Sequence, residues 1–142
     1  MENYIRDVKR LMGASILPAL LFSSILRAED RCSTPEKTLD TYLTAVNNRE
    51  WSLYIDSLSE RYRRILSGGF LGSPDRYETK EGREELFYKL DQGLQEKFSW
   101  QIISENVKGG NVTIHVKLSN RSRPDSFTLK REDDCWVIDN ID

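Results

Sequence analysis

The hydrophobic pattern of this sequence changes its period near residue 99, and this change restricts the possible folds more than any other feature. Before it, apolar residues recur at i, i+3, i+4 and i+7, which is the spacing of one face of an α-helix. After it, apolar and polar residues alternate, most strictly in 112–118, as in a half-buried antiparallel strand. This order predicts an α+β domain whose N-terminal helices pack on one face of an antiparallel sheet.

Two helices are expected in the first part of this region. The sequence Ser-Thr-Pro at 33–35 is typical of a helix start, and an apolar stripe at helical spacing follows it. Asn47–Asn48 predicts the end of this helix. A second stripe begins at Trp51, and we expect this helix to continue until Gly68–Gly69 stops it.

A loop, a third helix and the strands are expected next. The composition of 67–82 predicts a loop, and the apolar spacing beyond it predicts a helix from near Arg83 to near Phe98. Short turns then separate about four strands, which implies an antiparallel meander. The expected strands are 99–107, 112–119, 126–131 and 135–141.

Two stretches resemble exported bacterial members of the nuclear transport factor 2-like superfamily. They are TPEKTLDTYLTAVNNREWSLYIDSLS at 34–59 and DDCWVIDNI at 133–141. The resemblance spans residues 33–142 and implies a cystatin-like α+β cone, with three N-terminal helices packed on a curved sheet of about four antiparallel strands. Many exported relatives have no known activity, and the superfold includes enzymes, binding proteins and assembly domains.

The N-terminal segment has the layout of a signal peptide. Basic residues precede sixteen uncharged residues at 11–26, and Ala28 supplies a small residue before polar sequence. The apolar run is shorter than the roughly 20 residues that a spanning helix usually needs. We therefore expect a cleaved signal peptide at 1–28 and a domain at 33–142, with an uncleaved membrane anchor as the alternative.

The two cysteines, Cys32 and Cys135, lie near the ends of the expected domain. In an oxidising compartment such a pair is a candidate disulfide, and closing so long a loop would stabilise the fold by about 4–5 kcal/mol. The alternative is a buried Cys135 that acts as a small apolar residue and a free Cys32. Two cysteines and one histidine make a poor structural zinc site, so no metal is expected.

Enzymes of this superfamily, such as ketosteroid isomerases and polyketide cyclases, use an Asp or His as acid–base group in the pocket between helices and sheet. The single histidine, His115, shares the polar side of its strand with Thr113 and Lys117, so we expect it to face solvent. Asp139 is the better candidate, but both faces of its strand carry apolar residues, which leaves its direction open. A buried Asp139 would have a raised pKa and could act as a general base, whereas an outward Asp139 would be solvated or ion-paired.

Tyr42, Trp51 and Tyr54 are candidates for lining a ligand pocket, although aromatic residues at helical spacing more often belong to the core. Four arginines could receive an anionic ligand, but nearby acidic residues favour a mixed, solvated surface. These arginines are Arg61, Arg63, Arg64 and Arg76. The sequence lacks the Gly-Lys-Ser/Thr phosphate loop and the Gly-x-Ser-x-Gly nucleophile elbow.

These features predict an exported, periplasmic or extracellular domain without enzymatic activity or cofactor, which binds a small molecule or a partner protein. The net charge of −2 argues against a nucleic-acid partner. One alternative is an isomerase- or cyclase-like enzyme with Asp139 as general base. Another is a membrane-tethered assembly domain in which 11–26 stays uncleaved. The resemblance also implies a possible homodimer through the open sheet face, where Trp100 or Trp136 could lie.

Overall fold

Four α-helices precede four strands in the part of the chain that the structure describes, residues 30–90 and 96–142. The structure is a computed structural model, in which Cys32–Asp142 forms one compact unit. The predicted α+β class is confirmed, whereas the predicted signal peptide at 1–28 lies outside the described residues. The helices are α2 (Pro35–Asn48), α3 (Trp51–Asp56), α4 (Glu60–Leu71) and α5 (Lys80–Leu90), and the strands are β1 (Trp100–Lys108), β2 (Asn111–Leu118), β3 (Asp125–Glu132) and β4 (Cys135–Ile141).

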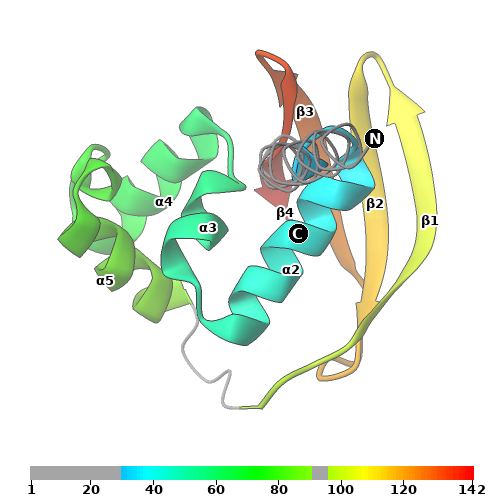
Figure 1. Ribbon diagram of the computed structural model, residues 1–142, viewed down its shortest axis with the longest axis horizontal. Coiled ribbons are helices and arrows are strands. Elements are labelled where there is room, and N and C mark those ends of the chain that lie inside the picture. The colour runs from blue at the N-terminus through cyan, green and yellow to red at the C-terminus, as the bar shows by residue number, and fades with distance from the viewer. Residues whose placement is uncertain (1–29, 91–95) are drawn as a thin grey trace, which may run out of the picture. The chain divides into compact units, whose positions relative to one another are not determined.

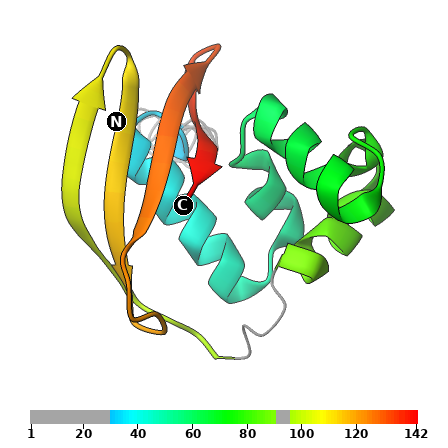
Figure 2. The same cartoon turned by 180° about the vertical axis from the view of Figure 1, so that it is seen from behind.

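The strands form a single antiparallel sheet in the order β1-β2-β3-β4, so the predicted meander is confirmed. Helix α2 lies against one face of this sheet, and α3, α4 and α5 lie beyond it on the side of β4 (Figures 1 and 2). Strand β1 is therefore the edge farthest from the α3–α5 group.

Helix α2 forms where the sequence predicts it. The Thr34 side chain accepts a hydrogen bond from the Lys37 amide at 3.2 Å, and Pro35 occupies the first turn. The helix ends at Asn48, as predicted, and is capped by Arg49, which adopts a left-handed conformation with φ of 56°. Its buried stripe includes Leu39 and Leu43 and faces the sheet.

The prediction of one continuous second helix was wrong, because a contact with the sheet divides it into α3 and α4. The Ser59 amide donates to the Ile138 carbonyl, and the Ile138 amide donates to the Ser57 carbonyl, both at 2.8 Å. These bonds draw the linker onto the edge of β4. The hydroxyl of Ser59 then accepts from the Tyr62 amide and starts α4.

The predicted loop at 67–82 was also largely wrong. Helix α4 continues through Gly68–Gly69 and ends at Gly72, whose φ of 77° suits a glycine cap. Helix α5 begins three residues before the expected Arg83 and is described as far as Leu90, and residues 96–98 are not helical. Residues 91–95 lie outside the description.

Gly82 explains how α5 can begin so early. A Cβ atom at this position would lie 1.7 Å from the carbonyl oxygen of Arg76, so the first turn of α5 packs directly on the backbone of the preceding 3-10 turn, Arg76–Glu78. A residue with a side chain could not allow this approach. The glycine that suggested a loop instead permits a close helix contact.

The core lies between the sheet and helices α2, α3 and α5. Strands β2 and β3 alternate as predicted, with Ile114, Val116, Phe127 and Leu129 buried against the helices. Aromatic contacts link the two layers. The ring centroids of Tyr42 and Tyr54 are 4.9 Å apart, those of Tyr54 and Phe87 are 5.1 Å apart, and those of Tyr42 and Phe127 are 5.9 Å apart.

Strand β1 departs from this alternation. Its pairing with β2 shifts register between Ile102 and Ser104, and most of its residues are exposed. Ile103 is 55% exposed and Val107 is 73% exposed. Trp100 instead packs against the core cluster. The exposed apolar surface of the sheet is thus on β1.

Candidate ligand pocket

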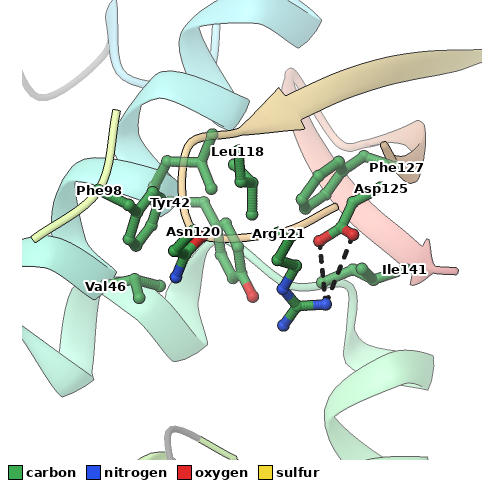
Figure 3. A pocket seen from close by; sticks show the side chains of 10 residues that line it. Tyr42, Val46, Phe98, Leu118, Asn120, Arg121, Asp125, Phe127 and Ile141 are labelled. Carbon is green, nitrogen blue, oxygen red and sulfur yellow. Dashed lines mark hydrogen bonds and ion pairs between the residues drawn. The ribbon is translucent and has the colours of Figure 1, made fainter. Parts of the chain in front are cut away.

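A pocket opens between α2 and the sheet, at the end where β2 turns into β3 (Figure 3). Its cavity volume is about 90 Å³. Because a water needs roughly 10–15 Å³ of such volume, the cavity has room for about six to nine atoms of that size. The lining residues are Tyr42, Leu43, Val46, Phe98, Leu118, Asn120, Arg121, Asp125, Phe127 and Ile141.

The wall of the pocket is apolar and comes from segments far apart in the sequence. Strand pairing places Phe127 opposite Ile141, and α2 supplies Tyr42 and Val46 from the facing layer. The Tyr42 side chain is nearly buried. Burial, together with the neighbouring Tyr54, raises the pKa of Tyr42 well above its ordinary value near 10. Its hydroxyl therefore stays protonated and neutral at physiological pH.

Charged groups lie on one side of the mouth. Asp125 is the first residue of β3 and pairs with Val116, while Arg121 lies in the turn that precedes it. The Arg121 Nη1 atom is 3.4 Å from each carboxylate oxygen of Asp125. The turn is held in place because the Arg121 amide donates to the Leu118 carbonyl, and Lys117 Nζ donates to the Arg121 carbonyl. An apolar pocket with a charged mouth suits an amphiphilic small molecule.

Only Tyr42 of the three aromatic candidates lines this pocket. Tyr54 stacks behind Tyr42, and Trp51 is half-buried against the core cluster. Sequence reasoning missed Arg121 and Asp125, because it treated 120–125 only as a turn. The signal that could have identified them is their i, i+4 spacing, which places an arginine four residues before a carboxylate at the first position of a strand.

Asp139 lies in a β-bulge that sequence alternation could not reveal. Thr128 pairs with Asn140 and Leu129 pairs with Ile138, so Asp139 between them has no opposite residue. This bulge breaks the period of β4. Asp139 is not among the residues that line the described pocket.

The carboxylate of Asp139 is held by three side chains. Its Oδ1 atom accepts from Ser59 Oγ at 2.7 Å and Arg61 Nε at 3.1 Å, and it lies 3.3 Å from Lys130 Nζ. Partial burial alone would raise the pKa of Asp139, but the hydrogen bonds from Arg61, Ser59 and Lys130 outweigh it and lower the pKa. This is an ion-paired carboxylate that fixes the start of α4 to β4.

The arginines proposed as an anion-binding cluster each contact groups of the chain itself. Arg61 bonds Asp139, Arg64 bonds Asp75 and Arg76 bonds Glu85. Arg63 donates through Nε to the carbonyl of Leu58 at 2.9 Å. These pairs fit the mixed charged surface that the sequence favoured.

His115 is half-buried on the polar side of β2, and its Nδ1 atom is 3.2 Å from the hydroxyl of Ser126 on β3. This is the side of the strand opposite the core, as the alternation indicates.

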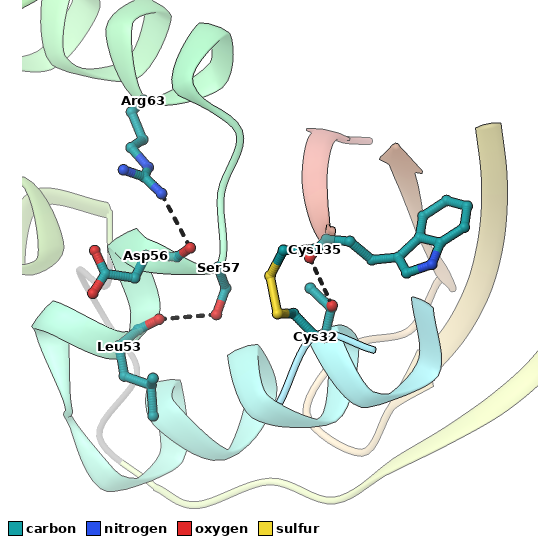
Figure 4. The surroundings of a disulfide bond; sticks show 8 residues. Cys32, Leu53, Asp56, Ser57, Arg63 and Cys135 are labelled. Atoms are coloured by element: carbon teal, nitrogen blue, oxygen red, sulfur yellow. Dashed lines mark hydrogen bonds between the residues drawn. A yellow bond between two sulfur atoms is a disulfide. The ribbon is translucent and has the colours of Figure 1, made fainter. Parts of the chain in front are cut away.

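Cys32 and Cys135 form a disulfide bond that joins the segment before α2 to the first residue of β4 (Figure 4). Two hydrogen bonds support the same junction. The Trp136 amide donates to the Cys32 carbonyl at 2.9 Å, and the Thr38 hydroxyl donates to the Trp136 carbonyl at 2.8 Å. The helical layer is thus tied covalently to the sheet.

Within residues 30–90 and 96–142, there is no group of three or more His, Cys, Asp or Glu side chains suited to a metal ion. No helix in the described part of the chain is long and apolar enough to cross a membrane.

No protein-family model matches this sequence, and no curated protein matches it. The fold is similar to that of a phospholipid-binding protein from Ralstonia solanacearum, solved with a phospholipid, at 12% identity over 80% of this chain and 77% of that chain, with a TM-score of 0.48. It is also similar to an NTF2-like protein of unknown function from Cytophaga hutchinsonii, at 13% identity over 76% and 86% of the two chains, with a TM-score of 0.40. The second protein carries the name of the superfamily that the sequence resembles.

Proposed function

We propose that this chain is a non-enzymatic binding domain that holds the apolar part of a small molecule in the pocket between α2 and the sheet. The observation that carries the proposal is the composition of the pocket, because seven of its ten lining residues are apolar or aromatic and the other three are Asn120, Arg121 and Asp125. The lowered pKa of Asp139 and its bonds to Arg61 and Ser59 support binding over the isomerase-like alternative, which requires a raised pKa in the pocket.

Export is part of the same proposal. A disulfide between Cys32 and Cys135 supports a location in an oxidising compartment, such as the periplasm or the medium. The intact mass of the protein recovered from its native compartment tests this. A mass that lacks about the first 28 residues is expected, and a full-length N-terminus would favour the membrane-tethered alternative instead.

The binding function can be tested with hexanol, whose chain and hydroxyl match the size and polarity of the pocket. Amide resonances of ¹⁵N-labelled protein are followed during titration with hexanol, and saturable shifts are expected at Tyr42, Leu118 and Phe127. Val46→Phe fills the cavity from α2 and should weaken binding at least tenfold, which corresponds to about 1.4 kcal/mol.

Val107→Phe is the matched control, because it makes the same substitution on the exposed face of β1. It should leave the affinity for hexanol unchanged. Equal affinities in the Val46→Phe and Val107→Phe variants, or shifts scattered outside the pocket, would overturn the proposed function.

A second copy of this chain is the partner that we propose for the edge strand β1. The other edge, β4, is bonded to Ser57 and Ser59, whereas β1 presents Ile103 and Val107 to solvent. Antiparallel pairing of two β1 edges would extend the sheet and place these side chains beside those of the second copy. Light scattering after size exclusion should then give the mass of a dimer. Ile103→Lys should lower this mass, whereas Ile65→Lys, at an equally exposed isoleucine of α4, should not. A monomer at every concentration refutes the dimer.

A further inference from the structure

The charged mouth of the pocket is asymmetric, because its cation is far more accessible than its carboxylate. The Arg121 side chain is 57% exposed, whereas that of Asp125 is 11% exposed. Arg123 lies two positions after Arg121 in the same turn. Arg121 is therefore the charged group of the lining that solvent reaches most easily, and its charge favours an anion.

Arg121 has donors available for such an anion. A guanidinium carries five N–H donors. Within the described residues, the guanidinium of Arg121 contacts only Asp125, and it does so through Nη1. The separation of 3.4 Å is long compared with the roughly 2.7–2.9 Å of a strong charge-assisted bond. Asp125 thus orients the guanidinium loosely, and the remaining N–H groups match the two oxygens of a carboxylate.

We propose that the ligand is a small apolar carboxylic acid, whose carboxylate binds Arg121 while its hydrocarbon part enters the pocket. This inference rests on the proposed binding function. The cavity of about 90 Å³ limits the part that enters to about six to nine non-hydrogen atoms. An amine would have to reach Asp125, whose two oxygens face Arg121 and are nearly closed to solvent.

The test compares three probes that share one hydrocarbon chain, namely hexanoate, hexanol and hexylamine, in amide-shift titrations at pH 7. Hexanoate should bind about tenfold more tightly than hexanol, since charge-assisted bonds are roughly twice as strong as neutral ones. Hexylamine should bind more weakly than hexanol.

Substitutions in the turn assign the preference to Arg121. Arg121→Gln should abolish the preference for hexanoate over hexanol. Arg123→Gln removes the same charge from the same turn outside the pocket lining and should change both affinities by less than about twofold, because exposed charges are screened. Asp125→Asn should tighten hexanoate binding, since Arg121 then loses its internal carboxylate partner.

Arg121→Gln leaves Asp125 buried without its cation, so the double variant Arg121→Gln/Asp125→Asn guards against loss of the fold. It should still give saturable shifts of the pocket amides with hexanol and show no preference for hexanoate over hexanol. Three results would overturn the carboxylate inference but not the proposed binding function. They are equal binding of hexanoate and hexanol by the unaltered protein, a preference for hexylamine, and equal effects of Arg121→Gln and Arg123→Gln. Failure of all three probes to shift the pocket amides would instead refute the proposed binding function.

Discussion

Removal of the disulfide between Cys32 and Cys135 is predicted to cost a large part of the stability of the domain. The two cysteines are 103 residues apart, and the bond restricts the unfolded chain by closing this loop. The chain-entropy relation gives a loss of about 16 cal/mol/K for a loop of this length, or about 4.7 kcal/mol at 25 °C. Domains of this size have a free energy of unfolding of about 5–15 kcal/mol, so the reduced protein should be marginally stable.

The measurement is equilibrium unfolding in urea of the unaltered protein and of the Cys32→Ser/Cys135→Ser variant. The variant should lose about 4–5 kcal/mol, and the unaltered protein with reductant should match it. Thr38→Val is a local control, since it removes only the hydrogen bond to the Trp136 carbonyl at the same junction. It should cost about 1–3 kcal/mol, the range for a buried group left without its partner.

A loss below about 1 kcal/mol in the double-serine variant would refute the loop-entropy reasoning. Two free thiols in the native, unreduced protein would refute the bond itself. Either result would also remove the main support for an oxidising compartment.

Three further perturbations test the packing around the site. Asp139→Asn should lower the free energy of unfolding by about 1–2 kcal/mol at pH 7. Because the folded pKa of Asp139 is lowered, the difference in stability between the two proteins should shrink as pH falls below the ordinary value of 3.8. A difference that is constant from pH 7 to pH 2 would contradict the pairing. The raised pKa of Tyr42 means that the folded state holds the hydroxyl proton more strongly than the unfolded state does. Stability should therefore fall as pH rises above about 10, and Tyr42→Phe should reduce that fall. Identical alkaline unfolding of the two proteins would exclude the effect. Gly82→Ala should cost about 1–3 kcal/mol by thermal or urea unfolding, because its Cβ would overlap the Arg76 carbonyl, whereas Gly69→Ala, which meets no atom, should cost less or stabilise α4.

The elements that depend on local signals could be predicted from the sequence. Capping by Thr34 and Pro35 starts α2, and strict alternation defines β2 and β3, because these features need only neighbouring residues. The division of α3 from α4 could not be predicted, since it comes from backbone bonds between Ser59 and Ile138, which are 79 positions apart. Gly82 misled the prediction for the same reason, as its role is a close contact rather than a turn.

The candidate site shows the same limit. Tyr42 was predicted from its stripe, but the pocket also needs the pairing of Phe127 with Ile141 and the Arg121–Asp125 contact, which only the folded sheet brings together. The direction of Asp139 depends on a bulge, and a bulge leaves no mark in the alternation of a strand that is apolar on both sides.

The central claim is that a small molecule occupies the cavity between α2 and the sheet. The most direct measurement is an isotope-filtered NOE experiment between unlabelled hexanol and ¹³C-labelled protein. We expect contacts from the hexanol methylene protons to the side chains of Val46, Leu118 and Phe127, all of which line the pocket. Contacts to Ile103 and Val107 on β1, with none to the pocket, would contradict the account.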